Sequence, residues 1–140
     1  MTAITKIDIA KMQLDRGISL YLDQSDFVSA ITLARASHEL IRRLGESVTG
    51  VRDKGIDAFA DLVVAISDQE GERTTTEDVV DRIFHFPNQL KHHGTGDADV
   101  LDANWPEEAS DIIELAISAW FRVTQTMTDE MMRFDQARRA

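Results

Sequence analysis

The chain has little of several residue types, and each scarcity excludes a class of protein. It contains 140 residues, no cysteine, two prolines and only 6% aromatic residues. The absence of cysteine excludes a disulfide framework, a thiolate metal site and a cysteine nucleophile. No apolar run approaches the roughly 18 residues that a membrane-spanning helix requires. The sequence therefore predicts a protein without a membrane span, whose core forms without covalent cross-links.

Basic side chains are also scarce. The chain has 15 lysines and arginines against 25 aspartates and glutamates, a formal net charge of −10. A surface of that sign repels nucleic acid phosphates and anionic lipids. We therefore expect no broad nucleic acid interface, and any such contact would use a local basic site. The candidate sites are short clusters: Arg42-Arg43, Lys91-His92-His93 and Arg138-Arg139.

The bulk properties also bound the location and the number of domains. The first residues, Met-Thr-Ala-Ile-Thr-Lys-Ile-Asp, lack the basic start and apolar run of a secretory signal. Together with the missing cysteines, this favours a cytoplasmic protein. A length of 140 residues suffices for one domain with its own hydrophobic core. We expect a single helical domain over residues 1–140.

Apolar residues recur at helical spacing along most of the chain, and no stretch alternates as a strand would. This predicts an all-α protein, an up-and-down bundle of about five helices with one long irregular loop. A stripe of Ile56, Phe59, Ala60, Val63 and Ile66 marks the third helix. The expected helices cover residues 5–24, 26–44, 56–67, 75–86 and 105–123, and a short last helix begins near 129, with a frayed tail over 135–140.

Punctuating residues refine these boundaries. Gly45 is expected to end the second helix, and Thr74 with Glu77 to form the capping box of the fourth. Pro87 should interrupt that helix, because it has no N–H to donate. Gly17 weakens the middle of the first helix, so we expect a close neighbour there.

The helical pattern stops between Phe86 and Trp105, and three of the four histidines lie in or beside this stretch. If residues 88–93 continue as a helix, Asn88 and His92 share one face, at positions i and i+4. A functional interpretation makes His92 a general base, with Lys91 holding an anionic substrate. A structural interpretation, which we prefer, has Asn88, Lys91 and His92 fixing an otherwise irregular loop.

The histidines do not have the spacing of a metal site. There is no helical His-x-x-x-His pair, and the adjacent His92 and His93 diverge on a helix. His85, with Asp97 and Asp99 nearby, does not complete a set of converging ligands. We therefore expect no bound metal and no cofactor. His38 falls on the second helix, where a neutral, buried core histidine is the expected role.

The last two helices carry a surplus of apolar residues. Trp120 and Phe121 are adjacent, so one of the two rings should point outward. Met127, Met131 and Met132 follow, with Phe134. Exposed apolar side chains on a small bundle favour self-association. We expect a homodimer, with a further protein partner as a second expectation.

One segment resembles a known family. Asn88-Gln89-Leu90-Lys91-His92, followed by an Asp-rich turn and by Pro106-Glu107 opening an apolar helix, is similar to a family of small uncharacterised bacterial all-helical proteins. The stretch 26–34, with Glu39 further on, resembles the second helix of that family. The chain departs from the family pattern at Gln89, His93 and Gly94. The resemblance implies a helical fold and no particular activity.

A broader likeness is to HEPN domains, helical bundles found in toxin–antitoxin and RNA-cleaving systems. This chain is similar to HEPN domains only in part: active HEPN ribonucleases carry an arginine, then four to six residues, then a histidine. Here nine residues separate Arg82 from His92, and two residues separate Arg82 from His85. Our main hypothesis is thus a non-enzymatic helical interaction module acting as a homodimer. The alternative is a HEPN-like ribonuclease or nucleotide-handling enzyme whose candidate catalytic residues are Arg82, Asn88, Lys91 and His92.

Overall fold

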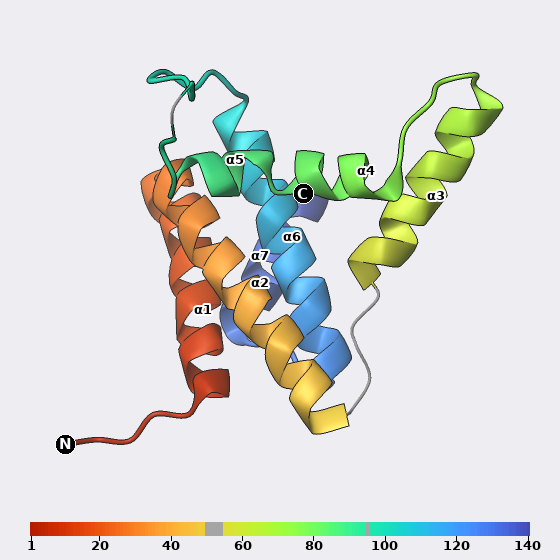
Figure 1. Ribbon diagram of the computed structural model, residues 1–140. Helices are drawn as coiled ribbons and strands as arrows, with labels where there is room; N and C mark the ends of the chain where they lie inside the picture. The colour runs from red at the N-terminus through yellow and green to blue at the C-terminus, as the bar shows by residue number, and fades with distance from the viewer. Residues whose placement is uncertain (50–54, 95) are drawn as a thin grey trace.

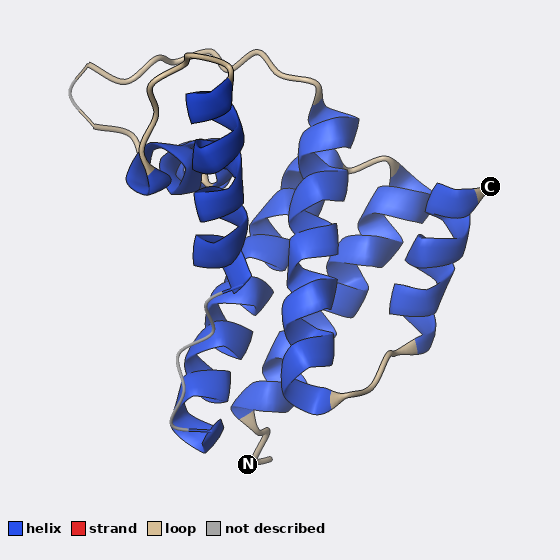
Figure 2. Cartoon of the chain, turned by 90° about the vertical axis from the view of Figure 1, so that its right-hand side faces the viewer, coloured by secondary structure: helices blue, strands red, loops and turns tan. Residues whose placement is uncertain are grey.

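The computed structural model describes residues 1–49, 55–94 and 96–140. Over these residues the chain is helical, with no strand (Figure 2), which confirms the all-α prediction. The described residues form seven helices rather than about five: α1 Lys6–Gln24, α2 Phe27–Thr49, α3 Gly55–Gln69, α4 Thr76–Ile83, α5 His85–Gln89, α6 Trp105–Thr124 and α7 Asp129–Arg139.

Four of these helices, α1, α2, α6 and α7, form the main bundle. Helix α2 lies between α1 and α6, and α7 packs on α1 (Figure 1). Their apolar faces meet in a core whose side chains are removed from water, and this burial is the main driving force for folding. The largest fully buried apolar side chains are Leu14, Ile18, Ile31, Ile41, Ile113, Met131 and Phe134.

Helices α1 and α2 approach each other closely. A Cβ atom on Gly17 would lie 3.3 Å from the carbonyl oxygen of Ala30 and 3.4 Å from Cβ of Leu33. Near this contact, the buried Ser37 hydroxyl donates a hydrogen bond of 2.7 Å to the carbonyl oxygen of Ala10. This bond ties the two helices together and satisfies a buried polar group. The close neighbour expected at Gly17 is confirmed.

Gly45 does not end α2, so this prediction is wrong. The helix continues to Thr49, and Gly45 is buried within it. A Cβ atom at this position would lie 2.8 Å from Cγ2 of Val123 on α6. The glycine therefore allows α2 and α6 to approach each other, where any side chain would collide.

The fourth helix also begins differently from the prediction. Its N-cap is Thr75, whose hydroxyl accepts a hydrogen bond from the Asp78 N–H at 3.1 Å. The Thr74 hydroxyl instead accepts a bond from the Arg82 guanidinium at 3.3 Å, so Thr74 and Glu77 do not form the expected capping box. The helix breaks at Phe84 (φ −99°, ψ 6°), three residues before Pro87, which lies buried inside α5.

The C-terminal tail is more ordered than the sequence suggested. Helix α7 starts at the N-cap Thr128 and runs to Arg139, so the expected fraying from Asp135 is wrong. The Arg138 guanidinium pairs with the Glu114 carboxylate on α6. Arg139 pairs with Asp135 one turn earlier, at 3.0 Å. These contacts explain why the last turn stays helical.

Helices α3 and α4 form a hairpin beside the bundle. Helix α3 packs on α4, and the Thr76 hydroxyl donates a 2.6 Å hydrogen bond to Asp61. In Figure 1, α4 runs across one end of the bundle, and α3 diverges from α6 along its length. Among the described helices, none is long and apolar enough to cross a membrane.

The Gly17 contact gives a stability prediction. Replacing Gly17 by Val should lower the free energy of unfolding by about 1–3 kcal/mol, because the new side chain meets the α2 backbone and forces the helices apart. Urea unfolding followed by circular dichroism measures the change. Met12→Val is the control, since Met12 is exposed on the same helix. Equal destabilisation by both substitutions would contradict the assignment.

Candidate functional site

The irregular stretch between α5 and α6 is held mainly by rings and backbone groups. The Phe86 and Trp105 rings, at its two ends, pack edge to face with centroids 5.6 Å apart. Within it, the Asp97 carboxylate accepts a 2.6 Å hydrogen bond from the Gly94 N–H. The exposed His93 and Asp99 side chains approach to 3.6 Å. The loop thus closes on an aromatic contact that the polar pattern did not indicate.

The candidate residues of this stretch are exposed. Helix α5 ends at Gln89, so the helix over residues 88–93 that would place Asn88 and His92 on one face is present only at residues 88 and 89. The Asn88 carbonyl oxygen accepts the N–H groups of Lys91 (3.2 Å) and His92 (3.1 Å). Within the described chain, the Asn88, Lys91 and His92 side chains form no hydrogen bond or ion pair with one another. Arg82 lies apart from them, against Thr74.

One histidine is buried, and it lies outside the irregular stretch between α5 and α6. His38 is fully buried on α2, as predicted, with its ring centroid 5.8 Å from that of Phe84. The Arg35 guanidinium lies over the same Phe84 ring, 4.0 Å from its centroid, a cation–π contact. Burial lowers the pKa of Arg35. Among the described residues, no three His, Asp or Glu side chains gather as a metal site would require.

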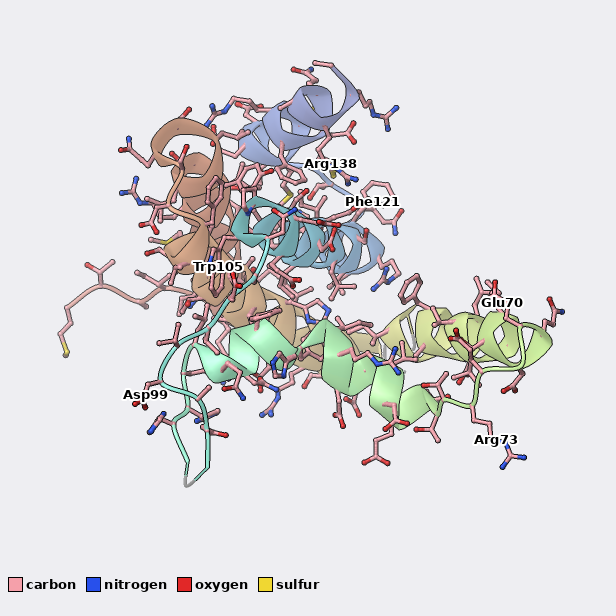
Figure 3. The ribbon with its side chains drawn as sticks, turned by 90° about the horizontal axis from the view of Figure 1, so that it is seen from above. Glu70, Arg73, Asp99, Trp105, Phe121 and Arg138 are labelled. Atoms are coloured by element: carbon pink, nitrogen blue, oxygen red, sulfur yellow. The ribbon has the colours of Figure 1, made fainter. Side chains whose placement is uncertain are left out.

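A groove of about 580 Å³ lies between α3, the α4–α5 segment and α6. Figure 3 shows these segments from above, with α3 extending to one side of α4 and α6. Most of its lining is apolar, which suits a cavity that takes an amphipathic ligand. The residues that line it are Phe59, Arg82, Ile83, Pro87, Glu108, Asp111, Ile112, Glu114, Leu115 and Ser118. Of the four catalytic candidates, only Arg82 belongs to this lining.

The α6 side of the groove is acidic. Partial burial raises the pKa of Glu108, and the neighbouring Asp111 and Glu107 raise it further, while His85 opposes them. Burial likewise raises the pKa of Asp111, together with Glu107 and Glu114, against a weaker effect of Arg138. The two carboxylates therefore repel each other and lose water on folding. The rim carries negative charge that His85 and Arg138 offset only in part.

Helix α3 carries an exposed apolar face, which we define as Phe59, Leu62 and Ile66. These side chains are 53%, 59% and 48% exposed, although the sequence pattern assigned Phe59 and Ile66 to the buried stripe. The buried side of α3 is formed by Ile56 and Ala60. Phe59 borders the groove, and the other two residues of the face do not line it.

The last two helices contribute less exposed apolar surface than expected. Trp120 is buried while Phe121 is exposed, which confirms that one ring of the pair points outward. Met131 and Phe134 are buried in the core, and Met132 is exposed. Of the two methionines of α7, Met131 closes the bundle and Met132 faces solvent.

Sequence reasoning missed the groove. The pattern of the sequence could not place α3 beside α6. The available signal was the α6 pattern Glu108, Asp111, Leu115, which puts two acids and an apolar residue on one helical face. Only the fold shows that this face lies opposite Phe59.

Comparison of the chain with protein-family models, curated proteins and solved structures finds no match. The resemblance to small bacterial helical proteins and to HEPN domains therefore stays a prediction. The features that bear on function are the groove and the apolar face of α3.

The acidic rim gives a prediction about pH. The folded-state pKa of both carboxyls lies above the ordinary value, so folding binds protons. As pH rises from the unfolded-state pKa to the folded-state pKa of these carboxyls, they lower the free energy of unfolding by a growing amount. The double variant Glu108→Gln/Asp111→Asn should therefore melt higher than the wild type at about pH 7 and nearly the same at about pH 3.

Thermal melts at both pH values test this. The matched control is Glu70→Gln/Glu72→Gln, which removes two charges from the exposed α3–α4 loop. A control that raises the melting temperature as much as the groove variant would show that only net charge matters.

Proposed function

We propose that this chain is a helical interaction module that assembles as a homodimer through the apolar face of α3. The observation that carries the proposal is the half-exposed row of Phe59, Leu62 and Ile66. These residues are spaced three and four apart, so they lie along one side of α3 and form a continuous surface. A row of large apolar side chains in water favours association.

A second copy is a suitable partner for such a row. In a two-fold dimer the same surface occurs on both copies, so an apolar row packs on its own equivalent. Antiparallel pairing of two α3 helices would remove Leu62 of each copy from water first, because it lies at the centre of the face. The charge of −10 on each copy opposes this approach, so the dimer should strengthen with added salt, which screens the repulsion.

The catalytic alternative has less support. It needs Arg82, Asn88, Lys91 and His92 at one place, but Arg82 is turned toward Thr74 and lines the groove, whereas the other three do not line it. A general base also needs a neighbour that orients it. We therefore propose a binding role and treat RNA cleavage as the outcome that would replace it.

Leu62→Glu tests the dimer. A carboxylate at the centre of the interface would face its own copy, so the variant should sediment as a monomer at about 100 µM, where the wild type is dimeric. Met12→Glu, which places the same charge on an exposed apolar position of α1, should leave the dimer intact. A wild type that sediments as a monomer at this concentration, in high and low salt, contradicts the proposal.

His92→Ala tests the alternative. If the chain is an interaction module, single-stranded RNA should remain intact with either the wild type or the variant, because no general base acts on it. Gel electrophoresis of labelled RNA, with both proteins purified in parallel, provides the measurement. Cleavage by the wild type that the variant loses would establish the nuclease in place of the module.

A further inference from the structure

The groove between α3 and α6 has an apolar floor and an acidic edge. Ile83 and Pro87 close it at the α4–α5 end, and Ile112 and Leu115 form its α6 side. Pro87 and Ile112 are buried, and Phe59 stands half exposed at the opposite wall. A ligand for this site needs an apolar side that displaces water from the floor.

The acidic edge of the groove, on α6, determines which charge the ligand should carry. Glu108, Asp111 and Glu114 follow one another along α6 at intervals of three residues, and all three line the groove. Arg138 already pairs with Glu114. Burial and neighbouring acids raise the pKa of the other two carboxyls, and His85 and Arg138 oppose this only in part, so a cation placed beside them would reduce the remaining repulsion.

The cation on the groove lining does not provide this compensation. Arg82 lies at the α4 end, where its guanidinium donates to the Thr74 hydroxyl at 3.3 Å. It is not among the groups that shift the pKa of Glu108 or Asp111, which are affected by His85 and Arg138 respectively. The ligand therefore meets negative charge along α6, which Arg138 offsets at Glu114, and Arg82 at the α4 end.

The shape indicates a helix. The α6 lining extends from Glu108 to Ser118, which corresponds to about 15 Å of helix, or roughly three turns. Phe59 of α3 lies on the other side of the groove. A third helix laid between α3 and α6 buries one apolar side and keeps the other in water, as in known helix-in-groove complexes.

We propose that this groove is the docking site for a basic amphipathic helix of a partner protein. Charge complementarity decides the occupant: α3 of a second copy carries Asp61 and no lysine or arginine, so it would add like charge to the rim. A helix with lysines or arginines beside a leucine-type stripe fits both surfaces. The site shares Phe59 with the dimer surface, which centres on Leu62, and docking does not require dimerisation.

A fluorescent synthetic peptide of leucine and lysine tests the site. The peptide has about 14 residues, enough for the required turns once bound, and its leucines lie on one helical side. Fluorescence anisotropy at about 0.15 M salt, where distant charges are screened, should show saturable binding to the wild type. A peptide with glutamate in place of lysine should bind at least about tenfold more weakly.

Matched charge variants locate the binding. Glu108→Gln/Asp111→Asn should weaken binding of the lysine peptide about tenfold, whereas Glu70→Gln/Glu72→Gln should change it by about twofold or less. Glu70 lies at the far end of α3, away from α6 (Figure 3). Equal losses in both double variants, or no binding of the lysine peptide to the wild type, would overturn the proposal.

Amide NMR shifts separate groove binding from attraction to the overall charge. Shifts on peptide addition should concentrate at Phe59, Ile112, Leu115 and Ser118. Shifts spread over the acidic loop between α5 and α6 would count against the groove. The titration is repeated on Leu62→Glu: because Leu62 does not line the groove, binding should persist there, so failure of the dimer and failure of the docking site give different results.

Discussion

The close contact of α2 with two neighbours is the constraint from which the remaining geometry follows. Gly17 allows the α1 backbone to approach Ala30, and Gly45 allows α2 to approach Val123 on α6. A side chain at either glycine would widen the spacing between helices that share the core. The position of α6 against α2 then fixes the acidic edge of the groove, because Glu108 and Asp111 lie on the side of α6 that α2 leaves uncovered.

The arrangement of the helices also explains the exposed apolar face of α3. The bundle covers α2 with α1 and α6, and the α3–α4 hairpin reaches the core mainly through Ile56 and Phe84. The inner side of α3 is therefore buried, but within the described chain no element covers its outer side. The acids of α6 have two effects in this arrangement. Glu107 and Glu108 interact favourably with the helix N-terminus, and Glu108, Asp111 and Glu114 make the groove lining negative.

Local features were predictable from sequence because they depend on residues near one another. The spacing of apolar residues alone predicts the helix at residues 5–24, the core role of His38 and the outward-pointing Phe121. Gly45 was not predictable, since a glycine that ends a helix and one that admits a neighbour look alike, and Val123 lies far along the chain. The choice of Thr75 over Thr74 as the cap depended on partners such as Arg82 and Asp61. Periodicity found the apolar residues of α3 but not which of them would be covered.

The two proposed surfaces are coupled through charge. Two copies carrying −10 each repel one another when their α3 faces meet, and a basic helix bound in each groove would reduce that repulsion. A partner that favours the dimer must, by thermodynamic linkage, bind the dimer more tightly than the monomer by the same factor. The two surfaces also lie next to each other, because the Phe59 ring belongs to both of them. We therefore expect the proposed partner binding and the proposed self-association to reinforce each other through the acidic composition of the chain.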